Sequence, residues 1–266
     1  EHRTLALRAA GRAEEAVEFL AKQREAPGAN LPLILRLRVR ALREAGQMDL
    51  MAGAIEEFQR LSPADPGARV YGIVQLALAK RTEAASLALD DYLFRFGGNP
   101  GNLRMLADPL GEIGVVTLLD RCEAAAAERG DLLQPFQLAR VQAQWQQSDW
   151  AAARETLAKI APSPVAGAVN TQVWREWMGH LLDAALSAGE VPQRSLVDFL
   201  RGRPWPFVIV SRSIETLRRA GRLETAEEVA LVASASFPDS EWLKIQIKEI
   251  RDDIADEKKK AVKPPP

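Results

Sequence analysis

The feature that most constrains the fold of this chain is a unit that recurs about every 34 residues. Its clearest copy runs from Gly221 to Pro238, where the glycine ends one predicted helix and the proline ends the next. Ala226, Ala230 and Ala233 form one stripe of the second helix because they are spaced by four and three residues, so another helix can approach that stripe closely. The unit is therefore a pair of helices, and its repetition predicts a stacked array.

The same turn can be followed along the whole chain. Its successive positions are Gly11, Gly46, Lys80, Gly114, Ser148, Gly189 and Gly221. The first five are separated by 35, 34, 34 and 34 residues. The interval of 73 residues between Ser148 and Gly221 holds two repeats with a few inserted residues, and Gly189 lies within it. About seven helix pairs at a nearly constant period indicate a repeat protein, in which each pair covers the apolar face of its neighbour.

The inventory of charges and reactive residues argues against several functional classes. Lys and Arg number 35 against 36 Asp and Glu, so no net charge draws the chain to nucleic acid or to a membrane surface. No apolar run approaches the roughly 20 residues of a membrane-spanning helix. Two histidines and one cysteine do not readily make a zinc cluster or a Cys/His dyad, and a single cysteine excludes an intrachain disulfide. We therefore expect no enzymatic activity, no cofactor and no bound metal.

The pattern resembles the tetratricopeptide repeat family over residues 1–240. The second-helix signature of that family, a glycine followed by an alanine five residues later, is carried by GRAEEAVEFL at 11–20 and by GRLETAEEVA at 221–230. The first-helix signature is weaker, and the repeats at 114 and 189 are degenerate. Four residues stand where a leucine is usual, namely Arg38, Gly72, Arg140 and Ser213. The resemblance implies an all-α, right-handed α-solenoid of about seven helix-turn-helix repeats, and a scaffold that binds a partner protein or peptide in a concave groove lined by the first helices.

The sequence predicts one array followed by a helix and a tail. The array covers residues 1–238, a capping helix covers 239–257, and KKKAVKPPP at 258–266 is basic and proline-rich like a linker. Because the chain starts at Glu1 and ends in this way, we expect a piece of a longer protein. Within the array, Pro109 and Gly111 predict that residues 103–114 are irregular. The capping helix has an apolar stripe that would either cover the last repeat or form a coiled-coil seam with a second copy: Leu243, Ile247, Ile250 and Ile254.

Arginines mark the face that is expected to bind a partner. Arg36, Arg40 and Arg43 are spaced by four and three residues, so their guanidinium groups form one stripe on a predicted first helix. Similar positions of other predicted repeats hold Arg8, Arg104 and Arg218. Such a groove suits an acidic peptide or a terminal carboxylate, because a guanidinium binds a carboxylate through two parallel hydrogen bonds. The alternative is a solvated face with acidic neighbours, and the asparagines of the family's carboxylate-clamp members are absent.

Other conspicuous residues are expected to be structural. His180 and Asp183 share one helix face but lack further metal ligands, so we expect a structural or surface role for His180. Cys122 lies beside an alanine run and is predicted to be a small buried residue. Most of the tryptophans are expected in the core, and Trp205, between two prolines, is expected to secure the start of a helix.

Two hypotheses from different classes follow. The first is a non-enzymatic scaffold that presents a preformed concave surface to a partner segment. The second is a structural spacer that oligomerises through the last helix, beside another domain of a larger protein. For a bacterial chain of this Ala- and Arg-rich composition, the family resemblance implies a module of an envelope-assembly, secretion or regulatory complex. Both the cytoplasm and the periplasm remain open as its location. A ligand-binding monomer would favour the scaffold, and self-association would favour the spacer.

Overall fold

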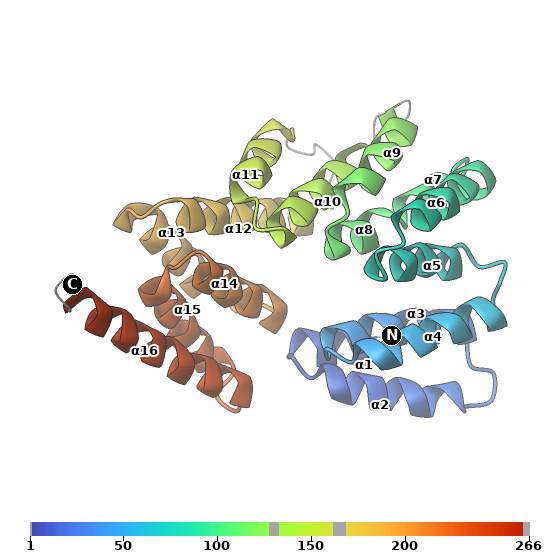
Figure 1. The fold of residues 1–266 in the computed structure, drawn as a ribbon. Coiled ribbons are helices and arrows are strands. Elements are labelled where there is room, and N and C mark those ends of the chain that lie inside the picture. Colours follow the sequence, from blue (N-terminus) through green and yellow to red (C-terminus); the bar gives the residue numbers. More distant parts are fainter. Residues whose placement is uncertain (1, 128–132, 162–168, 263–266) are drawn as a thin grey trace. The chain divides into compact units, whose positions relative to one another are not determined.

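The computed structural model describes residues 2–127, 133–161 and 169–262, and all regular structure in these ranges is helical (Figure 1). The predicted all-α class is therefore confirmed for these residues. Contacts between residues divide the chain into two compact units. The first unit comprises residues 1–8 and 12–161, and the second comprises residues 9–11 and 162–266.

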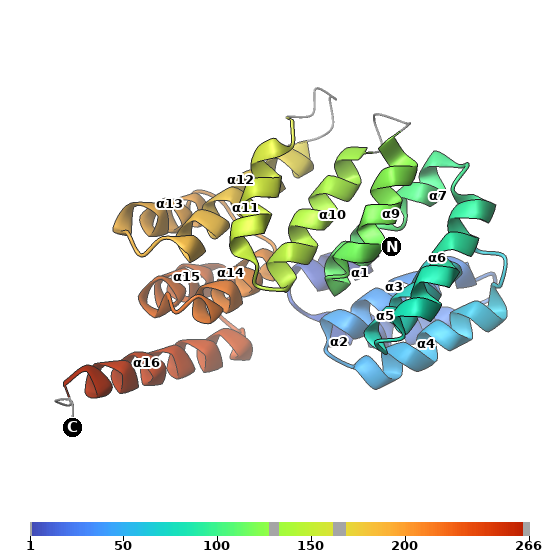
Figure 2. The ribbon, with the colours of Figure 1, turned by 45° about the horizontal axis from the view of Figure 1, so that its top comes forward.

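The first unit is built from short helices that pack against their neighbours in the chain. In order they are α1 (His2–Ala9), α2 (Ala13–Arg24), α3 (Leu31–Glu44), α4 (Met48–Leu61), α5 (Pro66–Leu78), α6 (Thr82–Phe96), α7 (Pro100–Arg104), α8 (Ala107–Ile113), α9 (Val116–Ala127), α10 (Leu133–Gln146) and α11 (Trp150–Lys159). From α2 to α6, each helix packs on the next. Farther along, α10 lies between α9 and α11 (Figure 2) and also packs on α8, which in turn contacts α5.

The second unit ends in a long helix that covers its predecessor. Its helices are α12 (Val169–Leu186), α13 (Glu190–Arg201), α14 (Phe207–Arg219), α15 (Leu223–Ser236) and α16 (Glu241–Val262). α12 packs on α13 and α14 on α15, while α13 also contacts α15. α16 runs along α15 (Figure 2), and Leu243 and Ile250 on it are buried. No helix in the described part of the chain is both long and apolar enough to cross a membrane.

One kind of turn ends six of the helices. The residue in the turn has a positive φ of 57° to 75° at Gly11, Gly46, Lys80, Gly114, Ser148 and Gly221. In each turn the next amide donates to the carbonyl five residues earlier, as Gln47 N does to Leu42 O at 2.9 Å. This is the Schellman arrangement, which satisfies carbonyls at a helix end. Gly189 differs, since its φ of −74° and ψ of 147° are extended and it immediately precedes α13.

The expectation that residues 103–114 are irregular is wrong, because they contain the end of α7 and all of α8. Pro109 lies in the first turn of α8, where the missing N–H would have had no partner within the helix. Gly111 lies where α8 meets α10. A Cβ added to this glycine would be 2.8 Å from Ala139 O and 2.9 Å from Ala139 Cα. The two residues that suggested a break therefore mark a helix start and a close contact between helices.

Three of the four positions that depart from the leucine of the tetratricopeptide pattern have polar partners in the structure. Arg38 on α3 forms an ion pair of 3.4 Å with Glu57 on α4. Arg140 on α10 forms ion pairs with Asp120 and with Glu123, the latter at 2.8 Å from Arg140 Nε to Glu123 Oε1. Ser213 on α14 accepts a hydrogen bond of 2.9 Å from the buried indole N–H of Trp177 on α12. At these sites, polar contacts between helices replace the contact of an apolar side chain.

The burial of the tryptophans agrees only in part with the prediction that most of them lie in the core, whereas the burial of Cys122 agrees fully. Trp145, Trp177 and Trp205 are at least nine-tenths buried, whereas the other three tryptophans are only partly buried. Trp205 stacks on Phe199, with 5.0 Å between ring centroids, just before the start of α14. Cys122 is fully buried on α9, which confirms its expected place in the core.

Candidate functional site

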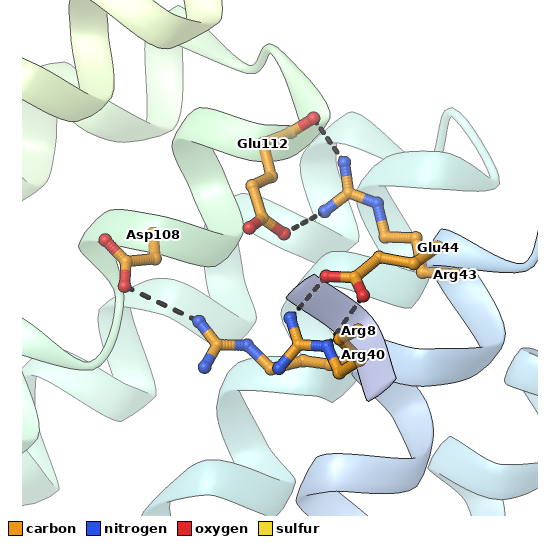
Figure 3. A network of polar contacts seen from close by, with 6 residues as sticks. All are labelled: Arg8, Arg40, Arg43, Glu44, Asp108 and Glu112. Atoms are coloured by element: carbon orange, nitrogen blue, oxygen red, sulfur yellow. Dashed lines mark hydrogen bonds and ion pairs between the residues drawn. The ribbon is translucent and has the colours of Figure 1, made fainter. Parts of the chain in front are cut away.

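Four of the six predicted binding arginines lie together in the first unit. Three of them reach carboxylates of the same unit in Figure 3, and the fourth, Arg36, lies one turn before Arg40 on α3. We call the following group the arginine cluster: Arg8, Arg36, Arg40 and Arg43 with the carboxylates of Glu44, Asp65, Asp108 and Glu112.

α3 positions three of these arginines. Asn30 precedes the helix and its Oδ1 accepts a hydrogen bond of 3.2 Å from Leu33 N, which fixes the first turn. Leu35, Val39 and Leu42 are buried, and each directly precedes one of the three arginines. The arginines therefore lie at the edge of the buried stripe, where their methylene groups can pack while the guanidinium groups stay among polar partners.

Arg8 and Arg43 are held by short ion pairs that connect helices. Arg8 donates two hydrogen bonds to the carboxylate of Glu44, one of them 2.6 Å from Arg8 Nε, and these bonds raise the pKa of Arg8. Arg43 donates to a carboxylate oxygen and to the main-chain carbonyl of Glu112 on α8 (Figure 3). No side chain of these two pairs is more than about one third exposed. They therefore join α1 to α3 and α3 to α8.

Arg36 and Arg40 are less completely paired. Arg36 Nη2 is 3.4 Å from Asp65 Oδ1, and the same oxygen accepts a shorter bond of 2.7 Å from Gly67 N at the start of α5. Arg36 Nε is buried and has no hydrogen-bond acceptor in the described part of the chain. Arg40 Nη2 is 3.5 Å from Asp108 Oδ2, and the side chain of Asp108 is 78% exposed. The long contacts of Arg36 and Arg40 therefore leave Nη donors that an incoming anion could use, whereas the buried Nε of Arg36 is out of its reach.

Tyr71 on α5 adds a hydroxyl group close to these charges. Burial raises the pKa of its phenol, while the positive charges of Arg40, Arg36 and Arg8 act in the opposite direction. Its ring packs near Phe58, with 6.4 Å between the centroids. Sequence reasoning did not single out Tyr71, because nothing in its local pattern shows that α5 brings it next to arginines of α3.

The two remaining predicted arginines lie elsewhere. Arg104 is the exposed last residue of α7, and among the described residues it joins none of the ion pairs of the arginine cluster. Arg218 belongs to the second unit. It donates to Gln246 and Glu249 at 2.6 and 2.8 Å and to Asp253 at 3.0 Å, so it connects α14 to α16.

Reactive groups outside the arginine cluster are few. The described residues contain no group of three or more His, Cys, Asp or Glu side chains that could hold a metal ion. Burial raises the pKa of the Cys122 thiol to about 12, so at neutral pH it is not a thiolate nucleophile. His180 Nδ1 on α12 lies 3.1 Å from Ser195 Oγ on α13.

Comparison with known proteins adds no assignment. No protein-family model matches the sequence, and no curated protein matches it. The geometry of the arginine cluster is therefore the observation from which a function can be proposed.

Proposed function

We propose that the chain is a non-enzymatic scaffold that binds an acidic segment of a partner protein on the face formed by the arginine cluster. The observation that carries the proposal is the difference among the four arginines. Arg8 and Arg43 each donate two hydrogen bonds to one glutamate, whereas Arg36 and Arg40 contact their carboxylates at 3.4 and 3.5 Å. A carboxylate of a ligand can take the free donors of Arg36 and Arg40 without breaking the short pairs that connect the helices.

The finer architecture proposed with this function is a tetratricopeptide-like α-solenoid. Six turns of the same Schellman geometry, spaced by 35, 34, 34, 34 and 73 residues, support this assignment. In that frame α3, α5, α8 and α10 are first helices of their pairs, and α5 and α10 each contact α8. Arg36, Arg40 and Arg43 then belong to the row of first helices, which lines the groove in the family that the sequence resembles.

The proposal can be tested with a variant that keeps the short ion pairs intact. Arg43→Glu would place a second carboxylate beside Glu112, so loss of binding in such a variant could reflect misfolding. Arg36→Gln combined with Arg40→Gln removes two charges and leaves Arg8 and Arg43 in place. Arg60→Gln combined with Arg95→Gln removes the same charge from exposed positions on α4 and α6 and is the matched control.

The measurement is fluorescence anisotropy with glutamate- and aspartate-rich peptides, including partner segments identified by affinity capture. We expect the Arg36/Arg40 variant to bind at least about tenfold more weakly, because hydrogen bonds to charged groups contribute about 1.5–3 kcal/mol each. We also expect affinity to fall as salt rises, and the control variant to bind like the wild type. Equal affinity of both variants would exclude the arginine cluster as the binding face.

The structural spacer remains the alternative function, and oligomeric state distinguishes it. The spacer hypothesis places self-association on the apolar stripe of α16, but Leu243 and Ile250 of that stripe are buried within the second unit. We therefore expect sedimentation to give a monomer at micromolar concentration. A dimer that Ile247→Asp dissociates without unfolding the chain would favour the spacer.

A further inference from the structure

A tyrosine hydroxyl without a hydrogen-bond partner lies at the edge of the buried core that α3 and α5 share. Tyr71 on α5 is 7% exposed, and its ring belongs to the buried cluster that contains Val39 and Leu42 of α3. Its hydroxyl has no hydrogen-bond partner among the described residues, and it is not fully enclosed. The ring is therefore held in the core, while the hydroxyl keeps a donor that a ligand can reach.

The packing of α5 on α3 places this hydroxyl level with Arg40. A Cβ added to Gly67, at the start of α5, would be 3.1 Å from Arg36 Nη2, so this part of α5 lies against α3. Short connections join α3 to α4 and α4 to α5, and each of these pairs is packed, so α3 and α5 run in the same direction. Tyr71 lies one turn after Gly67, and Arg40 lies one turn after Arg36. Tyr71 is therefore brought beside Arg40.

The charges around the hydroxyl agree with this placement. Burial raises the pKa of the Tyr71 phenol, and the charged groups that also shift this pKa all belong to the arginine cluster: Arg40, Glu112, Arg36 and Arg8. The phenol is therefore protonated at neutral pH. It can donate a hydrogen bond to an anion that also accepts from the two arginines with long contacts.

A single carboxylate suits these three groups. Arg36 and Arg40 offer Nη donors from neighbouring turns of α3, and the phenol adds one donor from α5. A carboxylate has about four acceptor positions on its two oxygens, so it can accept from all three groups. The arginine cluster holds as many carboxylates as arginines, so the second negative charge of a phosphate monoester would be repelled without a further cation to balance it.

We propose that Arg36, Arg40 and Tyr71 together anchor one aspartate or glutamate side chain of the partner segment, with the Tyr71 hydroxyl donating the third hydrogen bond. We call these three residues the carboxylate anchor. The inference rests on the proposed function of the arginine cluster and adds to it the ligand group and a third donor. Tyr71 then contributes to ligand affinity through a hydroxyl that stabilises no contact of the free chain.

The two tyrosines of the chain allow a direct test, because Tyr92 on α6 already donates a hydrogen bond of 2.8 Å to Asn102 O and serves as an internal reference. The full chain is prepared with tyrosine that carries ¹³C at Cζ, and Tyr71→Phe assigns the two NMR signals. The probe is the peptide acetyl-Gly-Glu-Gly-amide. We expect a saturable shift of the Tyr71 signal and none of the Tyr92 signal.

Two further peptides define the ligand group. Acetyl-Gly-Gln-Gly-amide, which has the same shape without the charge, should bind at least about tenfold more weakly, since hydrogen bonds to a charged group are the stronger ones. The corresponding phosphoserine peptide should also bind more weakly than the glutamate peptide. Tighter binding of the phosphoserine peptide, or an equal response to the glutamine peptide, would overturn the assignment to a carboxylate.

Tyr71→Phe separates a binding role from a structural one. This variant should bind glutamate-rich peptides about tenfold more weakly, whereas Tyr92→Phe, the matched control, should bind them like the wild type. Tyr71→Phe should also keep or raise the midpoint of thermal unfolding, because the hydroxyl has no partner to lose. Unchanged affinity, an unmoved Tyr71 signal, or weaker binding together with a lowered midpoint would overturn the inference.

The Arg36→Gln, Arg40→Gln variant distinguishes a failure of this inference from a failure of the proposed function. If that variant loses the binding of acidic peptides and Tyr71→Phe retains it, the arginine cluster binds acidic ligands without Tyr71, and only the inference fails. If the acidic peptides do not bind the wild type, or bind it and the double variant equally, the proposed function and the inference both fail.

Discussion

Lys80 and Ser148 adopt the left-handed backbone conformation that glycine adopts in the four other turns of the same kind. A side chain in this conformation costs roughly 1–2 kcal/mol, so these turns are strained relative to those with glycine. We expect Lys80→Gly to raise the free energy of unfolding by about 0.5–1 kcal/mol, since Lys80 is exposed. Gly46→Ala should lower it by about 1 kcal/mol although the new Cβ meets no atom within 4 Å. Urea denaturation followed by circular dichroism measures both, and a stabilising Gly46→Ala would contradict the role assigned to the turn.

Cys122 gives a second test at the scale of a single residue. Its pKa is raised to about 12 by burial, above that of a free thiol, so the thiolate population of the folded chain at pH 8 is very small. We expect iodoacetamide to leave the folded protein almost unmodified at pH 8 and to alkylate it rapidly in urea, as read by mass spectrometry. The modification rate should rise as the pH approaches 12 if the chain stays folded. Rapid alkylation of the folded protein at pH 8 would show that Cys122 is accessible.

At the scale of the helices, Gly111 decides how closely α8 and α10 approach. An added Cβ would meet main-chain atoms of Ala139 at 2.8 and 2.9 Å, and main-chain atoms cannot rotate away. We expect Gly111→Ala to destabilise the chain by about 1–3 kcal/mol. Gly53→Ala is the matched control, because it also lies inside a helix but has no atom within 4 Å of its added Cβ. The control should be neutral or up to about 1 kcal/mol more stable, owing to the helix propensity of alanine.

The attachment of α16 to the second unit can be tested in the same way. Ile250 is completely buried, whereas Ile245 on the same helix is 53% exposed. Truncation to alanine should cost about 2–5 kcal/mol at Ile250 and well under 1 kcal/mol at Ile245. Thermal unfolding of the two variants gives the comparison. Equal effects would mean that the stripe of α16 is not packed on α15 as described.

At the scale of the whole molecule, the first unit has the components of an independent domain. Three of its buried clusters are built from residues between Ala16 and Ala143. A length of about 150 residues is typical of a domain that folds alone. We therefore expect a fragment of residues 1–161 to be helical and to melt in one cooperative transition. A broad, non-cooperative melt of this fragment, compared with the full chain, would show that it requires the second unit.

Local patterns in the sequence were sufficient to locate most helices and their turns. A 3.6-residue period places apolar residues such as Leu35, Val39 and Leu42 on one face, and this depends only on helix geometry. The left-handed turns were located from the spacing of glycines, and the constant period extended them to Lys80 and Ser148. Local rules failed at Pro109 and Gly111 because both residues break helices on average, but one lies in a first turn and the other at a helix contact.

The composition of the candidate site depended on contacts between residues far apart in the chain. Helical spacing alone put Arg36, Arg40 and Arg43 on one stripe. The carboxylate partner of Arg36 lies 29 residues away in the sequence, and that of Arg43 lies 69 residues away. Charges at such separations meet only when the helices pack, so no local pattern could tell an arginine with a short ion pair from one with a long contact. For the same reason, no local pattern could show that Tyr71 lies near these arginines. Helix positions and turn types thus follow from short-range sterics and periodicity, whereas the pairing of each charge follows from the packing of the helices.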